Sequence, residues 1–590
     1  MSTRNSREEP RPVAAESTAD TEHENGTLST SVFGGGPEPV ECKNEEQAAK
    51  PKEEGMTKMQ IVTLMFALSI GTFLAAIDQT IVSTALPSIA ESFSASAIDY
   101  TWIGSAYLLP AAASPPPWGK LSDIWGRKPM ILLANVVFVI GSLIGALSVN
   151  IRMLIAGRVI QGIGGGGVLS LVYTVIGDMF SQRDRSLYYG IIGIVWGLAG
   201  GIGPILGGVF AKYVSWRWCF WINLPIDGIG FITLLFFLRI ETPKTPLVDG
   251  LKAMDWLGTT TVVGGTVMFL LGLVYGGVAY PWDSPTVICL IIFGLLTLVI
   301  FVVFEWKVAK YPLAPMRLFK SPSNNATFGI AFIHGFVYIA DMYYLPLYFQ
   351  SVIGASPLLS GVYILPVTLM ACFCSTLTGG YIKKTGRYRP PLYFGTALML
   401  LGHGLYIDLK PYASWPRIII YQLITAIGIG PLFQAPIISI FSQTKPADVA
   451  SAAAFSSFAR AMGTAISVVI GGVIFQNRMA AHYSQLRSVL PSERADMLTH
   501  GDATASTNLI QTFPAGVKQV VLKAYTDSLQ AEWIFYTAVS AVALGLSFLV
   551  SKQVLSKEHK IGKTGLAVQE AARLEEENAK KAKKGVDIES

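Results

Sequence analysis

Long apolar runs separated by short polar segments dominate the chain between residues 59 and 551. A helix needs about 20 mostly apolar residues to cross a bilayer. By that criterion the pattern predicts fourteen spans, at 59–83, 101–118, 130–148, 153–176, 187–211, 219–239, 254–275, 285–305, 326–350, 358–381, 391–408, 417–440, 449–474 and 532–551. The predicted fold class is therefore an all-α integral membrane protein.

The polar segments between the runs differ in charge, and this difference predicts the orientation of the chain. Basic residues follow the fourth and tenth runs (Arg183, Arg185, Lys383, Lys384, Arg387 and Arg389). The segments 92–99, 278–284 and 354–358 contain neither Lys nor Arg. Because basic loops stay on the cytoplasmic side, an even number of spans places both termini in the cytoplasm.

The composition agrees with a protein embedded in lipid. Of the 590 residues 51% are hydrophobic and only 14% are charged, whereas soluble domains carry about 25% charged residues. The net charge of +6 is spread over short loops, so we expect no nucleic-acid partner. The five cysteines form no CxxC pair, and we expect neither a disulfide framework nor a metal site. His334 and His403 lie in separate runs without an HxxxH motif or a nucleophile elbow, which argues against an enzyme.

Two loops repeat one spacing and so predict two related halves. Segment 379–387 has the glycine–glycine–arginine spacing of segment 119–127, with Lys383 in place of Asp123. Many transporters are built from such repeats. Each half then has six spans, and spans seven and eight are an inserted pair. The predicted parts are a disordered tail 1–55, a first half 56–240, a linker 241–320, a second half 321–552 with an outer loop 476–530, and a cytoplasmic tail 553–590.

Two ionisable residues inside the first half suggest a site. Asp78 is the only charged residue between 59 and 90, and Arg158 enters the fourth span from the outside. At similar predicted depths they either pair or share a proton-sensitive cavity, because an unpaired charge in a bilayer is costly. Gln161 continues the polar face of Arg158. The alternatives are that the Asp78 carboxylate is hydrated at the outer membrane interface and that the Arg158 side chain extends to the interface.

The second half also carries polar groups inside its spans. His334 and Asp341 lie on one face of span nine, and Arg460 lies in the middle of span thirteen. Asp341 either exchanges protons or pairs with Arg460, and the sequence favours neither reading. Tyr338 and its aromatic neighbours line a pocket for a flat organic ligand or belong to an interfacial aromatic belt. Further neutral hydrogen-bonding groups in these spans are Gln350, Gln422 and Gln434.

Small residues recur in the fifth span. Gly203, Pro204, Gly207 and Gly208 form a Gly-Pro-x-x-Gly-Gly motif. Such small residues let neighbouring helices approach to backbone contact.

Together these motifs resemble the major facilitator superfamily. Segment 119–129 is similar to its signature loop between helices two and three, Arg158 with its following glycines resembles the fourth-helix motif, and Gly203–Pro204 resembles the fifth-helix antiporter motif. Segments 78–87, 216–225 and 344–350 resemble the fourteen-helix drug:H+ antiporter branch, in particular fungal efflux pumps. Ile124 departs from the basic residue usual in the signature loop, and Lys383 departs from the usual Asp, so the second loop is not expected to form the same latch.

The resemblance implies a fold of two six-helix bundles with two extra linker helices, which rock about a central cavity. It implies a conformational latch at Gly119, Asp123, Gly126 and Arg127, in which Asp123 contacts a helix dipole or a loop arginine. It implies coupling of protons to substrate through Asp78 and Arg158 and, on the opposite wall, Asp341 and Arg460. Low-ranking cavity candidates complete the set, namely Gln161, His334, Tyr338, Gln350 and Gln434.

The expected function is proton-coupled efflux of small amphipathic organic compounds, such as a toxin, a secondary metabolite or a drug. The proton gradient takes the place of a cofactor, and we expect a monomer in the plasma membrane, with a vacuolar or vesicle membrane as the alternative. The competing readings are an importer or vacuolar transporter of amino acids or siderophores, and a receptor that binds without transport.

Overall fold

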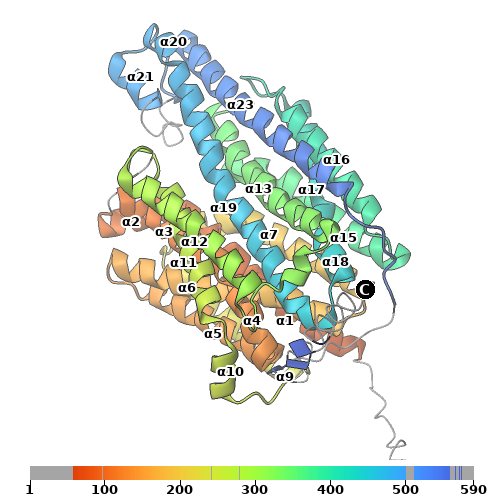
Figure 1. Ribbon diagram of the computed structural model, residues 1–590. Coiled ribbons are helices and arrows are strands. Elements are labelled where there is room, and N and C mark those ends of the chain that lie inside the picture. Colours follow the sequence, from red (N-terminus) through yellow and green to blue (C-terminus); the bar gives the residue numbers. More distant parts are fainter. Residues whose placement is uncertain are drawn as a thin grey trace, which may run out of the picture. The chain divides into compact units, whose positions relative to one another are not determined.

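The computed structural model describes residues 57–557 except 96, 241, 278 and 500–509, together with seven residues between 565 and 578. The expected tail 1–55 and most of the tail 553–590 lie outside the described residues. The regular elements of the described part are helices (Figure 1).

The first half consists of α1 (Lys58–Ile77), α2 (Ile81–Phe93), α3 (Ala97–Ala113), α4 (Pro115–Trp125), α5 (Arg127–Ala146), α6 (Ile151–Met179), α7 (Asp184–Tyr213), α8 (Trp218–Trp221) and α9 (Asn223–Phe237). Three residues, 78–80, interrupt the first predicted span between α1 and α2. Ser114, followed by three prolines, separates α3 from α4, because proline lacks the N–H that a helix interior needs. Gly126 ends α4 with φ +95°, a backbone conformation that favours glycine.

The linker consists of α10 (Leu247–Ala253), α11 (Trp256–Tyr275), α12 (Pro285–Lys307) and the short 3₁₀ helix η1 (Met316–Phe319). The second half consists of α13 (Pro322–Ser351), α14 (Pro357–Tyr363), α15 (Leu365–Thr385), α16 (Arg389–Tyr406), α17 (Trp415–Leu432), α18 (Ala435–Gln443), η2 (Pro446–Asp448), α19 (Val449–Ala481), α20 (Tyr483–Arg487), α21 (Ser492–Thr499) and α23 (Ala515–Ser547).

Twelve helices among the described residues are long and apolar enough to cross a membrane, so the chain is a multi-pass membrane protein. The predicted spans 101–118 and 391–408 are helical, as α3–α4 and α16, but are not among the twelve. The last span is longer than predicted, since α23 already begins at Ala515. The predicted outer loop 476–530 therefore contains helix ends as well as α20 and α21.

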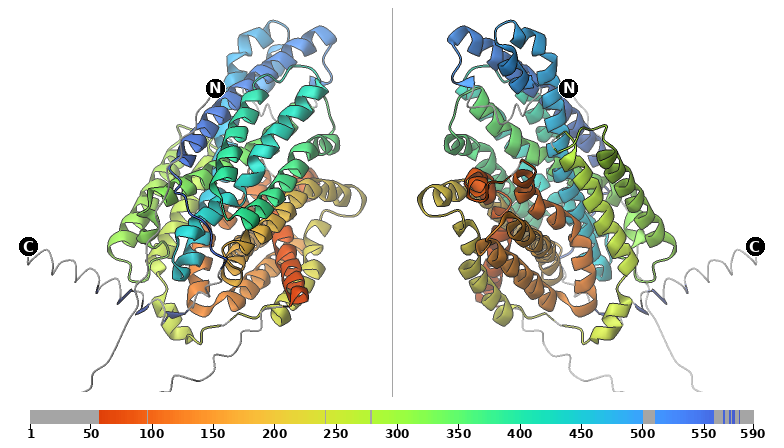
Figure 2. Two further views of the ribbon diagram at one scale, coloured as in Figure 1. Left: turned by 90° about the vertical axis from the view of Figure 1, so that its right-hand side faces the viewer. Right: turned by 90° about the vertical axis from the view of Figure 1, so that its left-hand side faces the viewer.

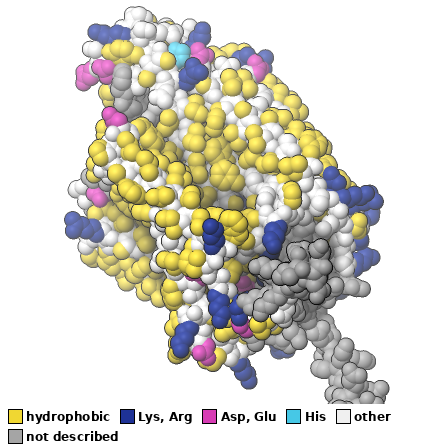
Figure 3. Space-filling model, viewed as in Figure 1, with side chains coloured by type: hydrophobic (Ala, Val, Ile, Leu, Met, Phe, Trp, Pro, Cys, Tyr) yellow, Lys and Arg dark blue, Asp and Glu magenta, His cyan; other side chains and the backbone are white. Residues whose placement is uncertain are grey.

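Apolar side chains cover much of the outer surface. On α12, Ile292, Phe293 and Val299 each leave more than half of their surface exposed. Figure 3 shows a broad hydrophobic area over this side of the molecule, with charged side chains mainly toward its two ends. This distribution suits a helix bundle whose solvent is lipid.

The helices of the two halves lie on two sides of the bundle, red to yellow for the first and green to blue for the second (Figures 1 and 2). Glycines of α7 allow α15 of the other half to pack closely. A Cβ added at Gly193 lies 2.5 Å from Ser375 Oγ, and one added at Gly197 lies 1.9 Å from Cys372 Sγ. Gly193 and Gly197 of the fifth predicted span thus serve contact between the halves.

One end of the bundle, here named the charged end, carries Arg127, Arg183, Asp184, Lys383 and Lys384. Lys383 of the second half pairs there with Asp184 of the first at 3.0 Å. In this pair the second loop contributes the cation, whereas the first loop carries the carboxylate Asp123 at the corresponding position.

The C-terminal segment also lies at the charged end. Arg183 Nε donates to the backbone oxygen of Leu555 at 2.8 Å. Farther along, the N–H of Gly565 donates to the backbone oxygen of Asp123 at 3.0 Å, and Leu566 packs with Ile124 and the linker. The N–H of Leu555 donates to the backbone oxygen of Gly386 at 3.0 Å, so this segment contacts both halves.

Candidate functional site

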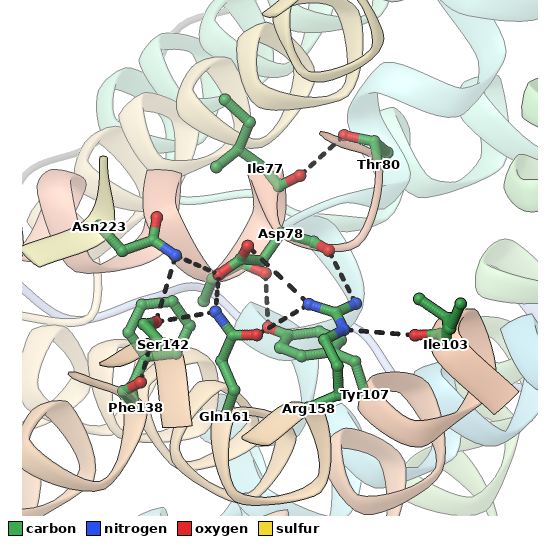
Figure 4. Close-up of polar contacts among 11 residues, drawn as sticks. Ile77, Asp78, Thr80, Ile103, Tyr107, Phe138, Ser142, Arg158, Gln161 and Asn223 are labelled. Carbon is green, nitrogen blue, oxygen red and sulfur yellow. Dashed lines mark hydrogen bonds and ion pairs between the residues drawn. The ribbon is translucent and has the colours of Figure 1, made fainter. Parts of the chain in front are cut away.

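The break between α1 and α2 places a buried carboxylate inside the first half. Asp78 follows the last residue of α1 and is 0% exposed. Its Oδ2 accepts hydrogen bonds from Gln161 Nε2 at 2.5 Å and from Asn223 Nδ2 at 2.8 Å (Figure 4). Ser142 Oγ lies within hydrogen-bonding distance of the same two amides, at 2.8 and 3.2 Å. Helices α5, α6 and α9 thus all contribute to the surroundings of Asp78.

Arg158 is the cation of this network. Its Nη1 lies 3.9 Å from Asp78 Oδ1, and its Nη2 donates to the backbone oxygen of Asp78 at 3.1 Å. Nη1 also donates to Gln161 Oε1 at 2.8 Å, and the guanidinium lies 4.5 Å from the centroid of the Tyr107 ring. Since Arg158 is only 1% exposed, it does not extend to an interface. The structure brings Asp78 and Arg158 together, as their predicted depths indicate.

The charge pair is not saturated with hydrogen bonds. Asp78 Oδ1 is buried and has no hydrogen-bond partner among the described residues. A buried charge is tolerated when it is paired and hydrogen-bonded. Here one carboxylate oxygen is bonded twice and the other faces Arg158 at long range. This leaves one oxygen at which a proton can bind and leave.

The antiporter motif lies directly against this break. A Cβ added at Gly203 lies 2.0 Å from Thr80 Oγ1, and one added at Gly207 lies 2.0 Å from the backbone oxygen of Ile81. Thr84 Oγ1 donates to the backbone oxygen of Pro204 at 3.0 Å. The motif therefore holds α7 in backbone contact with the segment that carries Asp78.

The latch residues form a second network at the charged end. Asp123 Oδ1 pairs with Arg127 Nη1 at 2.6 Å, and Arg127 Nε pairs with Asp178 Oδ2 at 2.6 Å. Asp123 Oδ2 accepts from Ser451 Oγ in the first turn of α19 at 3.3 Å. Gly119 lies against the same helix, because a Cβ added there is 2.7 Å from the Cβ of Ala454.

Part of this network was outside the sequence prediction. Asp178 and Ser451 are missing from the predicted set, although an acidic residue at the basic end of span four was a signal for Asp178. Asp123 was expected to contact a helix dipole or a loop arginine, and its carboxylate lies at the first turn of α19 and pairs with Arg127.

Of the two alternatives for Asp341, the pairing with Arg460 is wrong. Asp341 Oδ1 lies 3.1 Å from His403 Nε2 on α16. Arg460 Nη1 instead contacts His334 Nδ1 at 2.9 Å, and its Nη2 donates to the backbone oxygen of Phe433 at 3.2 Å. The two groups face different neighbouring helices, which depth in the membrane does not reveal.

The remaining cavity candidates separate into different roles. The half-buried Tyr338 reaches toward α7, with its hydroxyl 3.8 Å from a Cβ added at Gly200, and its ring lies 5.2 Å from that of Phe433. Gln434 donates to the backbone oxygen of Ser375. Gln350 contacts Ser360 at 3.4 Å within its own half.

The later tyrosines of the predicted aromatic cluster make different contacts from those of Tyr338. Tyr344 and Tyr348 donate to backbone oxygens of Val468 and Lys410 at 2.8 Å each, and Tyr343 is 50% exposed. Exposure of Tyr343 on the outer surface is consistent with an interfacial aromatic position.

Comparison with known proteins agrees with this architecture. Residues 68–468 match the model of the Major Facilitator Superfamily. The chain is 54% identical over 547 residues to an MFS-type transporter of Aspergillus terreus, a match that covers 89% of this chain and 99% of the relative. It is 49% identical over 519 residues to efflux pump dotC of Dothistroma septosporum, covering 88% and 89%. The solved MFS proton:xylose symporter XylE shares the fold at TM-score 0.53 and 13% identity, covering 88% and 100%. The chain belongs to the major facilitator superfamily.

Proposed function

We propose that this transporter exports small amphipathic organic compounds in exchange for protons. The Asp78 network carries the proposal, because a fully buried carboxylate lies opposite a buried cation and keeps one oxygen without a hydrogen bond among the described residues. A carboxyl group in such a place can take up and return a proton while Arg158 stabilises the ionised form. The efflux-pump name of the Dothistroma relative supports the outward direction.

The proposal includes fourteen spans and two cytoplasmic termini. Helices α3 and α4 pack beside α6, and α16 packs beside α17 and α23. They therefore run alongside helices that have the length and hydropathy of spans. An even number of spans with the basic charged end in the cytoplasm agrees with the distribution of Lys and Arg.

With this orientation, the contacts of Asp123 with Ser451 and of Lys383 with Asp184 close the cytoplasmic side. This corresponds to the outward-facing stage of alternating access. A proton arriving from outside at Asp78 weakens its attraction to Arg158. Since α7 touches the Asp78 segment through Gly203 and Gly207, a shift at that segment passes to α7 and from there to α15 of the other half.

The substrate class follows from the residues between the halves. Tyr338 and Phe433 present aromatic surface next to α7, and the guanidinium of Arg460 lies 5.7 Å from the centroid of the Phe433 ring. Aromatic faces bind flat apolar molecules, and a neighbouring guanidinium binds polar edges. We propose a monomer in the plasma membrane that carries toxins or secondary metabolites of this kind.

Transport in proteoliposomes tests the proposal with rhodamine 6G as the amphipathic probe. An imposed pH gradient is expected to drive uptake of the dye into vesicles with an acidic lumen, by inverted molecules. Asp78→Asn is expected to abolish this pH-driven uptake while the protein still inserts. Asp249→Asn, a change of an exposed carboxylate on α10, is the matched control and is expected to transport normally.

The outcomes separate the competing functions. If the Asp78→Asn variant still shows uptake driven by the pH gradient, Asp78 is not part of the coupling site. Binding of the dye without any flux would indicate a receptor. Transport of the dye in the same direction as the protons, down the proton gradient, would indicate an importer.

A further inference from the structure

The second half carries polar residues at helix positions that correspond to those of Asp78 and Arg158. Asp78 follows the first residue of α1 by 20 positions, and Asp341 follows the first residue of α13 by 19. Arg158 and Gln422 each follow the first residue of their helices, α6 and α17, by seven positions. The repeat of the two halves thus places a second carboxylate where the first half has Asp78, and a neutral amide where it has Arg158.

His403 replaces the missing cation as the partner of this second carboxylate. Its Nε2 lies 3.1 Å from Asp341 Oδ1, and its Nδ1 lies 2.8 Å from the backbone oxygen of Met399. A backbone oxygen only accepts, so Nδ1 carries a hydrogen. Nε2 then either accepts a hydrogen from a protonated Asp341 or donates its own as an imidazolium. In both cases the contact holds one proton between the two side chains.

Loss of that proton would leave a carboxylate facing the lone pair of a neutral imidazole. The pair therefore has two states, a neutral one with the proton and a singly negative one without it. Both side chains are 0% exposed, so the difference between the states matters energetically. An ordinary structural hydrogen bond between neutral groups has no such second state.

Buried polar groups of the second half have unused hydrogen-bonding capacity. Asp341 Oδ2, both amide atoms of Gln422 and both carboxyl oxygens of Glu532 are buried and have no hydrogen-bond partner among the described residues. Glu532 and Asp341 both act electrostatically on Tyr536, so both lie in its neighbourhood. Unpartnered polar atoms in a membrane interior indicate bound water or exchanging protons.

The titratable groups around Asp341 come from several helices. Helix α16 contributes His403 and Tyr406, and α23 contributes Glu532 and Tyr536. On α13 itself His334 lies seven residues away and is held by Arg460 of α19. Among the described residues no lysine or arginine forms an ion pair with Asp341.

We propose that Asp341 and His403 form a second proton-binding site, in the second half, which loads and releases a proton independently of Asp78. The proposal rests on the proposed proton coupling and extends it from one half to both. The proton passes between water and the Asp341–His403 pair without any change in covalent bonds. A transporter with both sites moves more protons for each substrate than one with Asp78 alone.

A difference titration tests the site with the proton itself as the probe. Purified protein in lipid nanodiscs is titrated potentiometrically from about pH 5 to 9, and the curve of Asp341→Asn is subtracted from that of the wild type. One proton per molecule is expected in the difference. Asp249→Asn, which removes an exposed carboxylate on α10, is expected to give a flat difference and serves as the control.

A flat difference for Asp341→Asn would overturn the proposal, because the proton would then be a fixed part of the structure. The difference for Asp78→Asn, measured in parallel, separates the two proposals: a proton there with none at Asp341 leaves the proposed function intact. If Asp341→Asn does not fold, His403→Gln takes its place and infrared spectroscopy replaces the difference titration. The infrared band of a protonated carboxyl is expected to titrate with pH in the wild type, and the midpoint pH of that titration is expected to shift in His403→Gln. An unchanged midpoint would overturn the proposal.

Discussion

Ser451 in the first turn of α19 donates a hydrogen bond to Asp123 Oδ2 at 3.3 Å, and this bond joins the two halves of the transporter at the charged end. The same carboxylate is held within its own half by Arg127 at 2.6 Å. Asp123 is therefore oriented by the first half before it contacts the second. A substitution of Ser451 by alanine removes this one hydrogen bond between the halves and leaves the Asp123–Arg127 pair in place.

Ser451→Ala is expected to shift the protein toward the conformation that is open at the charged end. Hydrogen bonds to charged groups contribute about 1.5–3 kcal/mol, so the open population is expected to rise at least about tenfold. Distances between spin labels at positions 128 and 445 measure this population. Ser456→Ala, a buried serine on the same helix, is the control, and equal distance distributions for the two variants would contradict the latch.

The sequence was sufficient to find the charged members of the first network but not its neutral ones. Asp78 and Arg158 stand out because charges are rare in apolar runs, and their depths could be counted from the span ends. Asn223 and Ser142 contact the same network. Small neutral polar residues are common in membrane helices, however, so neither differs from its neighbours in the sequence.

The second half shows where counting along a span fails. Positions along the spans suggested Arg460 as one alternative partner of Asp341, but such positions do not give the rotation of each helix about its axis. That rotation turns Asp341 toward α16 and Arg460 toward His334. The fourteen apolar runs, by contrast, all appear as helices, because the length of an apolar run depends on the bilayer and not on the neighbouring helix.

Arg158→Lys is expected to lower the transport rate at least about tenfold. The guanidinium donates to Asp78, Gln161 and the backbone oxygen of Ile103 from different nitrogens, and a lysine ammonium cannot reproduce this planar set of donors. The rate of rhodamine 6G transport in proteoliposomes measures the loss. Arg152→Lys changes an exposed arginine of the same helix and is expected to keep the wild-type rate. Equal losses in both variants would disprove a role for the planar set of donors of Arg158.

The docking of the C-terminal segment is expected to be independent of pH between about 5 and 8. The hydrogen bond from Arg573, and next the one from the Tyr311 hydroxyl, lower the pKa of Glu570 to about 2. Burial, and then the contact with Glu570, raise the pKa of Tyr311 to about 12. The lowered pKa of the Glu570 carboxyl stabilises the docked segment at pH values above the ordinary carboxyl pKa of about 4.3, and this stabilisation is lost only as the pH falls toward 2. The raised pKa of Tyr311 stabilises the docked segment at pH values below about 10, the ordinary tyrosine pKa, and this stabilisation is lost only as the pH rises toward 12.

Hydrogen–deuterium exchange of peptides around residues 565–574 measures this docking. Protection, corrected for the intrinsic effect of pH, is expected to stay constant over that range and to fall in Glu570→Gln. Glu493→Gln, on the exposed face of α21, is expected to leave it unchanged. Protection that changes between pH 5 and 8 would show that another group controls the segment.

Gly207→Ala and Gly208→Ala are expected to differ sharply although the glycines are adjacent. A Cβ at Gly207 would lie 2.0 Å from the backbone oxygen of Ile81 and 2.4 Å from Thr84 Oγ1, whereas nothing lies within 4 Å of one at Gly208. Because a backbone oxygen cannot move aside like a side chain, α7 must shift away from α2, at a cost of about 1–3 kcal/mol or more. Gly207→Ala is therefore expected to lower both thermal stability in detergent and the rate of pH-driven transport. Gly208→Ala is expected to change stability by no more than about 0.5 kcal/mol, and similar losses in the two variants would mean that α7 does not depend on backbone contact beside Asp78.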